Sequence, residues 1–228
     1  LPFTRLRNAS FDQKIGWRSD HRMLYLHLLG TFHATFGDNR EPAIETAKAK
    51  ALLAYFAVEN SRPHRREQLA AMFWPESSQK AAHQNLRQAL YVLRQQLRSP
   101  VNGDDAESTA GDYLVVTRQD ASFNVDSEHW IDAVLFSELI RSTEIHMHRR
   151  LDACPQCISR LEAAVELYTG GFLSGLTLAD AEELIRYATR RGLRPSPPPG
   201  ATGRRTAGSG APRRRGRPGP APRRPAPP

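Results

Sequence analysis

The stretch HQNLRQALYVLRQQL, at residues 83–97, holds side chains that could recognise the bases of a nucleic acid. Its polar residues recur three or four positions apart, so on a helix they share one face. An arginine can donate two parallel hydrogen bonds to guanine, and a glutamine can pair with adenine in the same bidentate way. The spacing predicts a helix whose candidates for base contacts are Gln84, Arg87, Gln88 and Tyr91.

The same helix has an apolar side that would anchor it. Each residue of a helix is rotated by about 100° around the helix axis from the one before it. The residues that then lie within about 60° of Leu86 are Ala82, Ala89, Leu90, Leu93 and Leu97. Basic residues gather beside this side, and no acidic residue occurs from Gln79 to Arg98. Solvated helix faces usually mix signs, because opposite charges four residues apart support the helix. The pattern favours a surface that faces phosphate, and an ordinary amphipathic helix is the alternative.

Further basic residues are candidates for contacts with a phosphate backbone. Arg65 and Arg66 begin a second predicted helix, whose first amides also favour an anion. Arg118 lies at the tip of a predicted hairpin, where it could reach a phosphate or the minor groove or could simply be solvated. The full set of phosphate candidates is Lys48, Lys50, Arg65, Arg66, Lys80, His83, Arg94 and Arg118.

The charge of +8 is unevenly distributed along the 228 residues. Eleven arginines and no acidic residue lie in 190–228, which leaves a net charge of −3 for the rest. Residues 40–100 carry a net +5, whereas residues 101–189 carry a net −10. A surface for nucleic acid is therefore expected in the first of these blocks, and phosphate should repel the second.

Periodicity predicts a mainly α chain with a small amount of β structure. Alternating apolar residues at 24–29 and 32–36 predict two strands, and residues 46–60, 65–73 and 78–98 predict three helices, the third capped by Ser77 or Ser78. Residues 112–125 predict a hairpin. A sheet, three helices and a hairpin, in this order, predict a winged helix-turn-helix over residues 23–126. Further helices are expected at 128–142, at 156–169 and from about 178.

The segments FWPESS, NLRQAL and LRQQL resemble the DNA-binding half of the bacterial transcriptional activator domain family, which includes the antibiotic regulatory proteins of actinomycetes. The resemblance covers about residues 23–183 and implies a winged helix of the OmpR/PhoB type followed by a tetratricopeptide-like activator domain. It also implies a sequence-specific transcriptional regulator that binds double-stranded DNA at direct repeats, as side-by-side protomers of a homodimer, and that contacts RNA polymerase.

Outside the winged helix, the sequence predicts three further regions. Residues 1–22 precede the first regular pattern and are expected to be a non-native leader or a disordered arm. Residues 127–189 are expected to be the start of the helical activator domain. The sequence departs from the family pattern after Glu183, and residues 190–228 use mostly Arg, Pro, Gly and Ala, which predicts disorder. A frameshift or a fragment is the hypothesis for this departure.

The residues HMHRRLDACPQC, at 146–157, contain the elements of a zinc site. Two thiolates and two imidazoles could complete a tetrahedral coordination shell, and the ligand candidates are His146, His148, Cys154 and Cys157. A redox-active pair is a second interpretation, and a third is that the cysteines are small apolar residues at a helix start. No cofactor is expected on the third interpretation.

The motifs of common enzyme classes are absent from the sequence. It has no glycine-rich phosphate loop, no G-x-S-x-G and no H-E-x-x-H, and we expect no catalysis. It also has neither a secretory signal nor a long apolar run, so we expect a cytoplasmic protein without membrane contact. A DNA-binding regulator is the first hypothesis. The alternatives are a protein-interaction adaptor with a structural winged helix and a non-functional fragment of a larger regulator.

Overall fold

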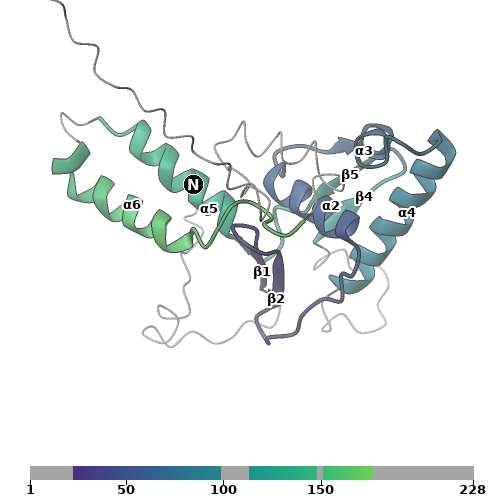
Figure 1. The fold of residues 1–228 in the computed structure, drawn as a ribbon, viewed down its shortest axis with the longest axis horizontal. Coiled ribbons are helices and arrows are strands. Elements are labelled where there is room, and N and C mark those ends of the chain that lie inside the picture. Colours follow the sequence, from purple (N-terminus) through teal and green to yellow (C-terminus); the bar gives the residue numbers. More distant parts are fainter. Residues whose placement is uncertain (1–22, 99–112, 148–150, 177–228) are drawn as a thin grey trace, which may run out of the picture. The chain divides into compact units, whose positions relative to one another are not determined.

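The computed structural model describes residues 23–98, 113–147 and 151–176 (Figure 1). The predicted leader, the helix expected from about 178 and the arginine-rich region at 190–228 lie outside the described residues. Among the described helices, none combines the length and the apolar composition that crossing a membrane would need.

The first sheet has the strand order β2-β1-β6. Strands β1 (Leu24–His27) and β2 (His33–Phe36) are antiparallel and confirm the two predicted strands. Strand β6 (His129–Ile131) lies parallel to β1 on its other side. The helix expected from residue 128 is therefore wrong in its first turn, because Trp130 and Ile131 are buried as strand residues against β1.

Three helices follow the first two strands, as predicted. They are α2 (Ala47–Val58), α3 (Arg66–Phe73) and α4 (Gln79–Gln96). The Oγ of Ser78 accepts a hydrogen bond of 3.4 Å from the amide of Ala81, so Ser78 is the N-cap of α4. Buried leucines and phenylalanines from all three helices meet in one core, which includes Leu52, Phe56, Leu69, Phe73, Leu86 and Leu93.

The predicted hairpin forms the outer part of a second sheet, with the strand order β3-β5-β4. Strands β4 (Leu114–Val116) and β5 (Asp120–Phe123) are joined by a turn, and β5 also pairs with the short strand β3 (His64–Arg65) just before α3. Helices α2 to α4 with this hairpin as a wing make a winged-helix arrangement. The chain is thus helix-rich with two small sheets.

Beyond the wing lie α5 (Asp132–Glu144), the short 3-10 helix η1 (Leu151–Ala153) and α6 (Pro155–Leu167). Helices α5 and α6 pack along each other, and the chain after α6 returns to the first sheet, where the amide of Leu173 donates to the carbonyl of Leu28 at 2.8 Å. These helices begin within four residues of the predicted starts at 128 and 156. The tetratricopeptide-like continuation stays a prediction, because it would need residues after Leu176.

The buried carboxylate of Asp132 ties the start of α5 to the end of β1. It accepts hydrogen bonds from the amides of Leu28 (2.8 and 2.9 Å), Leu29 (3.0 Å) and Ala133 (2.6 Å). Burial raises the pKa of Asp132 to about 6, although these three amides act in the opposite direction.

Candidate nucleic-acid interface

A surface hollow of about 410 Å³ lies where α3, α4 and the wing meet. We call it the basic hollow, because four arginines and one histidine surround it. Its lining residues are Arg65, Arg66, Glu67, His83, Leu86, Arg87, Arg118 and Gln119. Five of the predicted contact residues, from three separate elements, are therefore brought together at one place.

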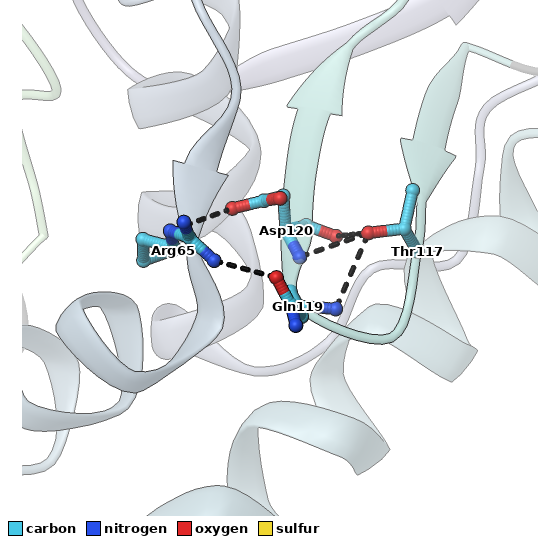
Figure 2. Close-up of polar contacts among 4 residues, drawn as sticks. All are labelled: Arg65, Thr117, Gln119 and Asp120. Atoms are coloured by element: carbon cyan, nitrogen blue, oxygen red, sulfur yellow. Dashed lines mark hydrogen bonds and ion pairs between the residues drawn. The ribbon is translucent and has the colours of Figure 1, made fainter.

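The wing is attached to the start of α3 by side-chain contacts at its tip (Figure 2). The guanidinium of Arg65 donates to the Oε1 of Gln119 at 2.7 Å and lies 3.5 Å from a carboxylate oxygen of Asp120. The Arg65 side chain is 60% exposed, so this ion pair adds little to stability. Its main consequence is geometric, because it holds the tip of the wing beside α3.

Thr117 organises the turn between β4 and β5. Its Oγ1 accepts hydrogen bonds from the amides of Gln119 (3.3 Å) and Asp120 (2.9 Å). Arg66 adds two bonds from the α3 side: its amide donates to the carbonyl of Gln119 at 2.8 Å and its guanidinium to the carbonyl of Thr117 at 3.1 Å. The exposed Arg118 is thus carried on a turn whose backbone is held from both sides.

The four predicted base-contact residues lie on the exposed face of α4. Arg87 donates a hydrogen bond of 3.0 Å to the Oε1 of Gln84, and Tyr91 is 59% exposed one turn further along. Gln88 is exposed between them. Arg87 also lines the basic hollow, so it connects this face with the arginines of α3 and the wing.

The remaining phosphate candidates are distributed over two helices. Lys80 and Arg94 are exposed near the two ends of α4. His83 is partly buried at the basic hollow, and its Nε2 has no hydrogen-bond partner among the described residues. Lys48 and Lys50 lie in the first turn of α2 and are not part of the hollow; the Lys50 ammonium lies 5.9 Å from the Phe32 ring centroid.

Three residues of this surface were not predicted from the sequence. Gln119 and Thr117 complete the tip of the wing. A threonine three residues before an aspartate is typical of a turn whose hydroxyl accepts backbone hydrogen bonds, so Thr117 could have been predicted from the sequence. Glu67, the one acidic residue of the hollow, occupies the first turn of α3, where a carboxylate complements the helix dipole.

The predicted metal ligands also meet in part. The Nδ1 of His146 lies 3.0 Å from the Sγ of Cys157 and 3.5 Å from the Sγ of Cys154. The two cysteines are not joined by a disulfide. His148 lies outside the described residues.

No protein-family model matches the chain, and no curated protein matches it. Among solved structures, the chain is similar to Mycobacterium tuberculosis EmbR in complex with low affinity phosphopeptide, with 18% identity and a TM-score of 0.49. The match covers 74% of this chain and 43% of the EmbR chain, so this chain spans less than half the length of that structure. The resemblance to the bacterial transcriptional activator family therefore stays a prediction.

Proposed function

We propose that this chain is a sequence-specific DNA-binding transcriptional regulator. In this proposal α4 enters the major groove and the wing contacts the sugar–phosphate backbone. The observation that carries it is the basic hollow, where Arg65, Arg66, Arg87 and Arg118 come from three elements to one surface. A cluster of like charges is unfavourable by itself, and a polyanion that spans the three elements would neutralise it.

The length of α4 assigns different tasks to its two halves. Its 18 residues extend over about 27 Å, whereas a major groove is about 12 Å wide. The N-terminal part, as far as Gln88, can enter the groove, and it carries Gln84, Arg87 and Gln88. The hydrogen bond from Arg87 to Gln84 orders both side chains before binding. Tyr91 would then meet the groove wall, and Arg94 would meet the backbone.

The contacts at the wing tip support a backbone contact rather than base recognition there. Arg65 is already engaged with Gln119 and Asp120, so its main task is to position the wing. Arg118 is exposed at the tip of the wing, so its guanidinium is accessible to a phosphate. Helices α5 and α6 would serve self-association or contact with RNA polymerase.

The test begins with selection of duplexes by the full chain from a random library, followed by fluorescence-anisotropy titrations against salt. Each phosphate contact should contribute about −0.9 to the log–log slope of affinity against salt. Arg118→Ala should therefore reduce the slope by about 1 and weaken all duplexes alike. Arg87→Ala should cost about 1–3 kcal/mol at one base position and relax the preference there.

The matched control is Arg141→Ala, because Arg141 is an exposed arginine of α5 away from the basic hollow. All variants keep residues 190–228, whose eleven arginines would bind any polyanion, and the titration is repeated with that region removed. If no duplex is enriched, or if Arg87→Ala and Arg141→Ala behave alike, the proposal is wrong. The adaptor with a structural winged helix would then remain.

A further inference from the structure

We propose that His146, Cys154 and Cys157 bind a zinc ion that joins the end of α5 to the start of α6. Their ligand atoms all lie within 4.8 Å of one another, although His146 and Cys157 are eleven positions apart in sequence. His146 follows the last residue of α5 by two positions, and Cys154 is the N-cap of α6. This inference does not depend on DNA binding.

The spacing of the three ligand atoms is close to what a tetrahedral zinc site needs. With Zn–S and Zn–N bonds of about 2.3 and 2.0 Å, a sulfur and a nitrogen in one shell lie about 3.5 Å apart. The His146 Nδ1 lies 3.5 Å from the Cys154 sulfur, which fits, and 3.0 Å from the Cys157 sulfur. Of these two separations, an ion would need to open only the second, by about half an ångström, and the two sulfurs lie within 4.8 Å of each other.

The helix pair that carries the three ligand residues is braced close to them. The guanidinium of Arg160, three residues after Cys157, donates a hydrogen bond of 3.1 Å to the carbonyl of Ser142 in α5. The end of α5 and the first turns of α6 are therefore held together where the ligand atoms meet.

Such an ion would cross-link α5 and α6, which otherwise contact each other through side chains. His146 follows α5, Cys154 is the N-cap of α6 and Cys157 lies in its first turn, so binding fixes both helix ends to one point. The described residues supply three ligands, and His148, which lies outside the described residues, stays the predicted candidate for the fourth position of a tetrahedral shell.

A disulfide between Cys154 and Cys157 is the competing interpretation of these residues, and the role of His146 distinguishes it from a zinc site. A disulfide needs only Cys154 and Cys157, whereas a zinc site also needs the imidazole. The test therefore compares the full chain with His146→Ala, Cys154→Ser and Cys157→Ser, all purified under reducing conditions. His33→Ala is the matched control, because His33 is an exposed histidine on β2.

The measurements are metal content by mass spectrometry and titration with cobalt(II), whose visible absorption reports a tetrahedral site with thiolate ligands. Stoichiometric zinc is expected in the wild-type chain and in His33→Ala, and its loss in both cysteine variants. His146→Ala should weaken zinc affinity by more than the roughly 10–100-fold that losing an outer-shell partner costs.

Cys157 is buried, so its variant could fail to fold. The two half-buried ligands are therefore tested independently by His146→Ala and Cys154→Ser, with circular dichroism to verify folding. Absence of stoichiometric zinc from the reduced wild-type chain would overturn the proposal. So would an unchanged affinity in His146→Ala. A disulfide that forms readily in a chain without metal affinity would assign the pair to redox chemistry instead.

Discussion

Replacement of Asp132 by Ala should destabilise the chain strongly, because one carboxylate satisfies three buried backbone amides. The residues that donate these bonds, Leu28, Leu29 and Ala133, are at most 1% exposed, so water cannot replace the lost acceptor. Two of the three lie at the end of β1, and the third is in the first turn of α5. The substitution therefore tests whether this side chain holds the first sheet and α5 together.

The expected loss of stability in Asp132→Ala follows from two opposing contributions to the free energy of unfolding. Each orphaned amide costs about 1–3 kcal/mol, so the three cost about 3–9 kcal/mol. Removal of the carboxylate also relieves its unfavourable burial, and a rise in the pKa from 3.8 to about 6 corresponds to about 3 kcal/mol. Asp132→Ala should therefore lower the free energy of unfolding by about 3 kcal/mol at pH 7. Asp132→Asn keeps one acceptor oxygen and should lose less.

Urea unfolding followed by circular dichroism measures this difference. With a denaturant dependence of about 2 kcal/mol per M, the midpoint should fall by about 1–2 M in Asp132→Ala. Asp126→Ala is the control, because Asp126 is exposed before β6 and its loss should change stability by no more than about 0.5 kcal/mol. Equal midpoints for the two alanine variants would refute the reasoning.

Four further outcomes are expected. Because the pKa of Asp132 is raised in the folded chain, the native state binds more protons than the unfolded state between about pH 4 and 6. The stability of the wild-type chain relative to Asp132→Asn should therefore fall as the pH rises through this window. Urea midpoints of both chains at several pH values would measure this. Gly30→Ala should cost about 1–3 kcal/mol in urea unfolding, because Gly30 has φ +115° and an added Cβ would lie 2.5 Å from the Oγ1 of Thr169. Leu93→Ala should lower the free energy of unfolding by about 2–5 kcal/mol in the same measurement, since the Leu93 side chain of α4 is fully buried in the core. Thr117→Val should weaken binding to all duplexes in anisotropy titrations while leaving the preferred sequence unchanged, because it loosens the wing tip and not α4.

The helices of the winged arrangement could be predicted because their signals act within a few residues. The i, i+4, i+7 spacing of Leu86, Leu90 and Leu93 predicted α4 and its buried side. The pair Ser77 and Ser78 predicted where the helix begins, and the structure selects Ser78 as the cap. Hydrogen bonds within a helix join residues four apart, so a local pattern contains most of the information that such an element needs.

The amino-acid sequence by itself therefore determined α2 to α4, the β4–β5 hairpin and the residue types on the exposed face of α4. The tertiary structure decided the strands β3 and β6, because elements of two or three residues exist only through partners such as β5 and β1, far away in the chain. It also decided that Arg65 meets Gln119, 54 positions later, and that the His146 imidazole meets both cysteines. Such contacts depend on where packing of the core brings distant backbone segments, and no periodicity within one segment encodes that.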